Sequence, residues 1–156
     1  MPLLASFLAL ALLFQPQPTA LERFFSGRTQ GSGSVNILFS GTSAVRTEGR
    51  GQILQDGSFV LEHLVRQEGE ADRRRTWRMR RAGPGRYTGS ISDARGAVNA
   101  EVTGNRVHVA YQTQEGYWVD QTITINPDGR TASNRTRFRR LGINVATLQE
   151  TIRKLD

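Results

Sequence analysis

Two histidines are the side chains best suited to metal binding or proton transfer, so their placement is considered first. His63 shares its parity with the apolar Leu61, whereas His108 is out of phase with Val107. Because alternate residues of a strand point to opposite faces of the sheet, we expect the two imidazoles on opposite sides. The sequence therefore predicts no shared histidine metal site.

The remaining candidates for chemistry are isolated carboxylates, at Glu62, Asp93, Glu101 and Asp120. None forms a spaced pair that would divide acid and base roles, and Asp93 is typical of a turn. The chain has no cysteine, which removes thiolate zinc sites, cysteine nucleophiles and the acylated cysteine of a lipoprotein. Nucleophile-elbow, phosphate-loop and zinc-protease motifs are also absent. We predict that the protein is not an enzyme. We expect no catalytic residues, no bound metal and no cofactor.

An apolar run from Leu3 to Phe14 precedes a segment that contains Pro16 and Pro18. At 1.5 Å per residue, about a dozen helical residues span only about 18 Å, which is short for a membrane core of about 30 Å. The run is typical of a secretory signal peptide. We expect residues 1–20 to be that signal and residues 21–156 to form one domain, exported to the periplasm of a Gram-negative envelope.

Arginine clusters form the strongest polar signal in a chain with a formal charge of +7. Interleaved arginine and aromatic residues can bind single-stranded nucleic acid, but export disfavours that reading, and we predict no nucleic-acid partner. Anionic lipid is the alternative, and a solvated strand face paired with nearby acids is another. The candidate anion-contact residues are Arg74, Arg78, Arg80, Arg137 and Arg139.

The elements that must position these residues have a period of two. Apolar residues alternate with polar ones from residue 35 onward, and short turn signals such as Asp56-Gly57, Gly104-Asn105 and Asp128-Gly129 separate the runs. This pattern predicts an all-β antiparallel meander of about eight to ten strands that closes into a barrel. Leu21 to Phe25 could form one helical turn, and the spacing of Val145, Leu148 and Ile152 predicts a short C-terminal helix over 145–155.

Several stretches resemble the bacterial envelope family known as domain of unknown function 3833. They are Phe25-Ser26-Gly27, residues 74–81, Tyr87-Thr88-Gly89 with Asp93 and Gly96, residues 101–105, Tyr111, Asp128, Asn134-Arg135 and residues 142–145. The resemblance covers nearly the whole chain after the signal, and it implies a lipocalin-like fold. The chain lacks the family's lipobox cysteine, so it is not predicted to be a lipoprotein. The resemblance implies no reaction.

The leading hypothesis is therefore a periplasmic, lipocalin-like protein that binds an apolar or amphipathic ligand, such as a fatty acyl lipid, inside the barrel. The same inward side chains could instead simply fill the core. A second hypothesis is a non-enzymatic envelope interaction protein that uses an arginine-rich face on anionic lipid or on a protein. The candidate interior residues are Phe59, Leu61, Trp77, Met79, Tyr87, Tyr111 and Phe138.

Overall fold

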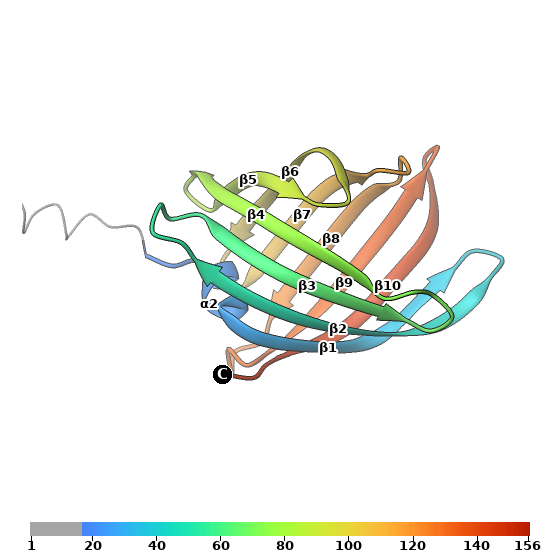
Figure 1. Cartoon of the computed structure of the whole chain (residues 1–156), viewed down its shortest axis with the longest axis horizontal. Helices are drawn as coiled ribbons and strands as arrows, with labels where there is room; N and C mark the ends of the chain where they lie inside the picture. The colour runs from blue at the N-terminus through green and yellow to red at the C-terminus, as the bar shows by residue number, and fades with distance from the viewer. Residues whose placement is uncertain (1–16) are drawn as a thin grey trace, which may run out of the picture.

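Ten antiparallel strands form a closed barrel in the computed structural model, which describes residues 17–156 (Figure 1). The predicted signal peptide lies mostly in residues 1–16, outside the described part of the chain. Sequence neighbours pair throughout, and the ring closes where the first strand meets the last. The predicted all-β meander and its closure are confirmed.

The strands are long enough to run obliquely around the barrel. Their bounds are β1 Gly27–Ile37, β2 Gly41–Ile53, β3 Phe59–Gln67, β4 Arg73–Gly83, β5 Arg86–Ile91, β6 Ala94–Thr103, β7 Arg106–Thr113, β8 Trp118–Ile125, β9 Thr131–Arg140 and β10 Ile143–Lys154. One short helix, α2, spans Ala20–Phe25 and precedes β1. No helix within residues 17–156 has the length and apolarity needed to cross a membrane.

The period of two places one face of every strand inside the barrel. On β3, Phe59 and His63 face inward and Glu62 faces solvent; on β4, Met79 is buried while Arg78 is exposed. The buried cluster runs around most of the ring and includes residues of β3 to β10 and of α2. Sequence parity therefore distinguishes the two faces of these strands, although Val60 and Leu64, which share the parity of Glu62, are also buried.

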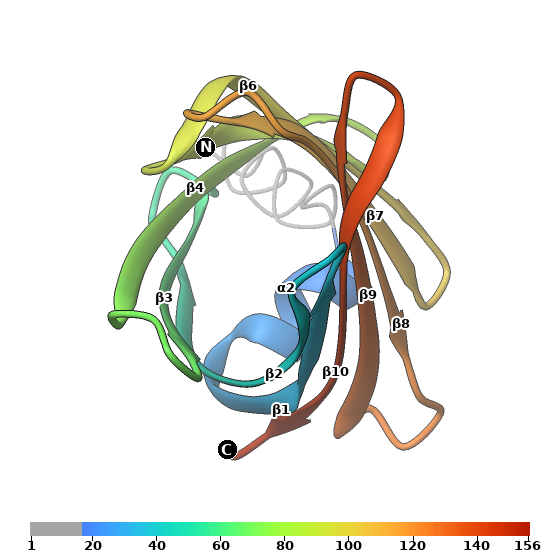
Figure 2. The same cartoon turned by 90° about the vertical axis from the view of Figure 1, so that its right-hand side faces the viewer.

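The helix α2 closes one end of the barrel. Thr19 caps it, since its hydroxyl accepts a hydrogen bond from the backbone N–H of Glu22 at 3.4 Å. Figure 2 looks along the barrel from the opposite end and shows α2 lying across the far opening. The helix approaches β2 at Gly51, where a Cβ would lie 2.8 Å from the Phe59 ring and would also meet the carbonyl of Phe25. Glycine is required there for the helix to pack so closely.

The C-terminal segment corrects one prediction. Residues 145–155 do not form a helix, because Ile143–Lys154 is strand β10, paired with β9 and β1. Leu148 and Ile152 are four residues apart, a spacing that fits a helix face and also one face of a strand. Glu150 lies between them on the same inward face, and this buried charged residue interrupts the apolar alternation that indicates a strand. The single helical turn at Leu21–Phe25 was predicted correctly.

Candidate functional site

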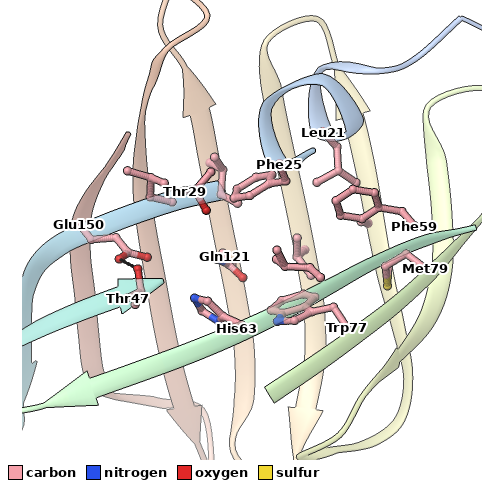
Figure 3. A pocket seen from close by; sticks show the side chains of 15 residues that line it. Leu21, Phe25, Thr29, Thr47, Phe59, His63, Trp77, Met79, Gln121 and Glu150 are labelled. Carbon is pink, nitrogen blue, oxygen red and sulfur yellow. Dashed lines mark hydrogen bonds between the residues drawn. The ribbon is translucent and has the colours of Figure 1, made fainter. Parts of the chain in front are cut away.

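A cavity of about 60 Å³ lies inside the barrel, between α2 and the middle of the strands (Figure 3). That space is large enough for water, since a cavity of about 10–15 Å³ suffices for one molecule. Its lining residues come from α2 and from eight strands. They are Leu21, Phe25, Thr29, Thr47, Phe59, Leu61, His63, Trp77, Met79, Ala100, Val109, Gln121, Ile123, Glu150 and Ile152.

The cavity has an apolar half and a polar half. Leu21 and Phe25 from α2 face Phe59 and Met79 at the closed end of the barrel. Farther from the helix the lining becomes polar, with His63, Gln121, Glu150 and Thr47. Figure 3 shows His63 and Trp77 side by side on β3 and β4. The interior therefore changes from apolar to polar along the barrel axis.

Two buried polar atoms in this lining have no hydrogen-bond partner among residues 17–156: Nδ1 of His63 and Nε1 of Trp77. Their strands pair directly, with His63 opposite Arg75 and Leu61 opposite Trp77. An unsatisfied buried donor or acceptor costs about 1–3 kcal/mol. A bound molecule that supplied a hydrogen-bonding group to either atom would remove this cost.

His63 is held in its neutral form. Burial is the main cause that lowers the pKa of His63 to about 3, and the positive charges of Arg75 and Arg73 lower it further. Asp93 opposes this effect but is outweighed. A neutral imidazole offers one donor and one acceptor. The surrounding arginines also make this part of the cavity electrostatically favourable to an electron-rich group.

Opposite His63, a chain of hydrogen bonds links residues of four strands and passes over a fifth. Gln121 donates to Asn134 at 3.1 Å, Asn134 donates to Glu150 at 2.8 Å, and the Thr47 hydroxyl donates to Glu150 at 3.0 Å. The last bond passes over β1 at Gly31, where a Cβ would collide with both Glu150 and Thr47. Glycine at this position thus permits the contact. The polar groups on this side satisfy one another, unlike His63 and Trp77.

Burial raises the pKa of Glu150 above its ordinary value, although the hydrogen bonds from Asn134 and Thr47 act in the opposite direction. The residue has no cationic partner among residues 17–156, since none of the ion pairs there includes it. A buried carboxyl without a cation favours its protonated form. Glu150 therefore binds a proton more readily than an exposed glutamate does.

Arg75 braces the side of the site that faces away from α2. Its guanidinium pairs with Asp93 at 2.9 Å and donates to the hydroxyl of Tyr111 at 2.8 Å. It also lies 5.3 Å from the centre of the Trp77 ring, which packs edge-on against Tyr111. These contacts fix the orientation of Trp77. Burial lowers the pKa of Arg75, but Tyr111 and Asp93 outweigh it and leave the pKa raised.

All seven predicted interior residues face the inside of the barrel. Phe59, Leu61, Trp77 and Met79 line the cavity, whereas Tyr87, Tyr111 and Phe138 belong to the packed core around it. The barrel is therefore partly filled and partly hollow. Whether these residues bind a ligand stays a prediction.

The five predicted anion-contact arginines are exposed, but they do not form one face. Arg74, Arg78 and Arg80 lie on β4, and Arg137 and Arg139 lie on β9. Four strands separate β4 from β9 in each direction around the ring. The two groups therefore occupy opposite sides of the barrel.

The inward polar residues Gln121, Asn134, Glu150 and Thr47 were not among the predicted site residues, nor was Arg75. Each shares the parity of apolar neighbours on its own strand, for example Arg75 with Trp77. Parity alone could have nominated them. The assumption that inward positions are apolar concealed this signal.

The sequence profile of one family, described as a protein of unknown function (DUF3833), matches residues 14–154. The chain belongs to the DUF3833 family. The resemblance noted from short motifs is thus confirmed over nearly the entire barrel of this DUF3833 protein. No curated protein matches the chain.

Among solved structures, this DUF3833 protein is similar to the S-type phycobiliprotein lyase CPES from Guillardia theta. The TM-score is 0.66 at 8% identity, and the match covers 90% of this chain and 98% of the other. At this identity the similarity establishes the fold alone. It also contradicts the prediction that the chain is not an enzyme, because a protein with this barrel is named a lyase. The lack of a linear catalytic motif was insufficient ground for that prediction.

Proposed function

We propose that this barrel binds one small amphipathic molecule, such as a compound with a fatty acyl chain. The polar group of the ligand contacts His63 and Trp77, and its apolar part extends toward α2. The observation that carries the proposal is the pair of buried, unpartnered atoms on these two residues, which face a cavity whose other end is apolar. The similarity of the fold to a phycobiliprotein lyase supports the choice of the barrel interior.

The size of the cavity limits what enters without rearrangement. Its volume of about 60 Å³ is well below the several hundred Å³ typical of sites for drug-sized ligands. A long acyl chain must therefore displace side chains at the apolar end, where Leu21 and Phe25 of α2 are the most peripheral. Binding of such a ligand then involves a shift of α2.

The compartment is part of the proposal. The Leu3 to Phe14 run favours export, and in the envelope the abundant amphipathic molecules are lipids and their acyl products. A periplasmic barrel that takes up one such molecule is consistent with the gradient from apolar to polar lining.

Fluorescence of Trp77 tests the proposal directly. Trp118→Phe leaves Trp77 as the sole tryptophan, because the chain has two. Titration of this variant with decanoic acid and with decanol should give a saturable fluorescence change. Adding His63→Leu should weaken binding of at least one ligand about tenfold, as expected from loss of one hydrogen bond.

His108→Leu on the outer face is the matched control and should leave affinity unchanged. A titration without saturation for either ligand would overturn the proposal. Equal affinities for the His63→Leu and His108→Leu variants would overturn the assignment of the polar group.

A further inference from the structure

Five of the six exposed large apolar residues within residues 17–156 gather at the end of the barrel away from α2. Leu38 and Phe39 lie in the β1–β2 turn, Leu141 lies in the β9–β10 turn, Ile143 begins β10, and Trp118 begins β8. We call these five residues the apolar rim. The sixth, Ile53, ends β2 at the opposite end. Such segregation is not expected of scattered surface apolar residues.

The tips of the two turns have an unusual backbone. Phe39 has φ 67° and Leu141 has φ 51°, and they are the only residues other than glycine with positive φ in the described part of the chain. This conformation normally selects Gly, Asn or Asp. Phe39 is 99% exposed and Leu141 is 94% exposed, so packing does not account for either side chain. Both turns therefore hold an apolar side chain where folding alone would favour a small or polar one.

The two turns project from neighbouring strands of the same sheet. The backbone N–H of Leu38 donates to the carbonyl of Val145 at 2.9 Å, which joins the base of the β1–β2 turn to β10. Figure 1 shows both turns at the end farthest from α2. The apolar side chains thus stand on two turns that project from neighbouring strands.

Arginines flank the apolar rim. The second half of β9 carries four arginines, Arg135, Arg137, Arg139 and Arg140. Of these four, only Arg139 forms an ion pair within residues 17–156, with Asp120 at 3.6 Å. Arg140 stacks over Tyr117 at 5.1 Å, beside Trp118. Of the acidic residues at this end, Glu68, Glu70 and Asp72 lie around the β3–β4 turn and Asp93 lies at the β5–β6 turn, while Glu115 and Asp120 are nearer to β9 and are outnumbered there by the four arginines. The charge near the β9–β10 turn is therefore positive.

We propose that the apolar rim is a membrane-docking surface. Phe39 and Leu141 enter the interfacial region of an anionic bilayer, and the β9 arginines contact phosphate head groups. Projecting apolar tips with cationic neighbours suit an anionic lipid surface, because the apolar side chains can enter the interfacial region while the arginines pair with phosphate groups. This surface lies outside the cavity and does not depend on the proposed ligand.

Vesicle flotation with the full mature protein tests this proposal. Vesicles of phosphatidylglycerol and phosphatidylethanolamine should bind the protein at least tenfold more tightly than vesicles of phosphatidylcholine, and salt should weaken the binding. The double variant Phe39→Asn, Leu141→Asn should lose at least tenfold in affinity. Asparagine tolerates positive φ, so the double variant should remain folded.

Ile53→Asn is the matched control and should bind vesicles as the unaltered protein does. Thermal unfolding of the double variant establishes that the barrel is intact. Equal binding of the double variant and the unaltered protein would overturn the proposal. So would a lack of preference for anionic vesicles, which would leave a protein as the partner of the apolar rim.

Discussion

Glu22 on α2 and Arg81 on β4 form a two-pronged ion pair, with Nη2 to Oε2 at 2.9 Å and Nε to Oε1 at 3.1 Å. Tyr87 also donates to Glu22 at 2.7 Å. Burial tends to raise the pKa of Glu22, but the hydrogen bonds from Arg81 and Tyr87 outweigh it and hold the pKa below its ordinary value. An ionised, almost fully buried carboxylate therefore fastens the helix to the barrel.

Arg81→Met should weaken the attachment of α2 and lower the free energy of unfolding. The substitution leaves the carboxylate of Glu22 buried without its cation, a change that typically costs about 3–5 kcal/mol. Urea unfolding should show a loss of about this size. Arg80→Met, on the exposed face of the same strand, should change stability by less than about 0.5 kcal/mol. Similar losses in both variants would contradict the role of the ion pair.

Acid should destabilise the barrel through His63. The pKa of His63 is about 3 in the folded protein and about 6.5 in the unfolded chain. The contribution of neutral His63 to the free energy of unfolding is therefore complete above pH 6.5, and it is lost as the pH falls toward 3. At pH 5 the loss is about 2 kcal/mol. Unfolding of His63→Gln at pH 7.5 and pH 5 should show a smaller decrease than that of the unaltered protein. His108→Gln should retain the full decrease.

Glu150 should act in the opposite direction. Its folded pKa is raised, so the favourable contribution is present below pH 4.5 and is lost as pH rises through the folded value. Glu150→Gln removes the buried charge while its amide can still bond to Asn134 and Thr47. Stability of this variant relative to the unaltered protein should therefore increase between pH 5 and pH 8. Parallel pH profiles for the two proteins would show that Glu150 does not titrate in this range.

Export can be checked by intact-mass analysis of the periplasmic fraction. Loss of about the first twenty residues is expected, within the usual range of signal peptides. The cut affects a contact seen in the structure, since Thr19 caps α2 and also hydrogen-bonds to Tyr87 at 2.7 Å. A mature chain beginning at Leu21 should therefore be less stable than one that retains Thr19. Full-length protein in the cytosol would contradict export.

Parity in the sequence was enough to predict most of the fold and the side of the sheet for each chosen residue. As predicted, His63 and His108 face opposite sides, and Trp118, which is out of phase with the buried Val119 in the sequence, is exposed. Partners across the barrel could not be read in this way. The bond between Thr47 and Glu150 joins residues 103 positions apart, and it depends on the ring closing through Gly31. Side chains at turn tips were equally hidden, since Phe39 continues the strand alternation in sequence but lies beyond the strand.

The pairing of β1 with β10 has a consequence for how the chain acquires its structure. Thr29 lies opposite Lys154, so the ring closes only when almost the last residue is present. Contacts between such distant positions form slowly, because a long loop must be ordered first. Until then β1 and β9 each have one unpaired edge, and such edges make an incomplete chain prone to aggregation. A chain whose barrel has not yet closed can still pass through a translocation channel, as an export pathway for unfolded chains requires.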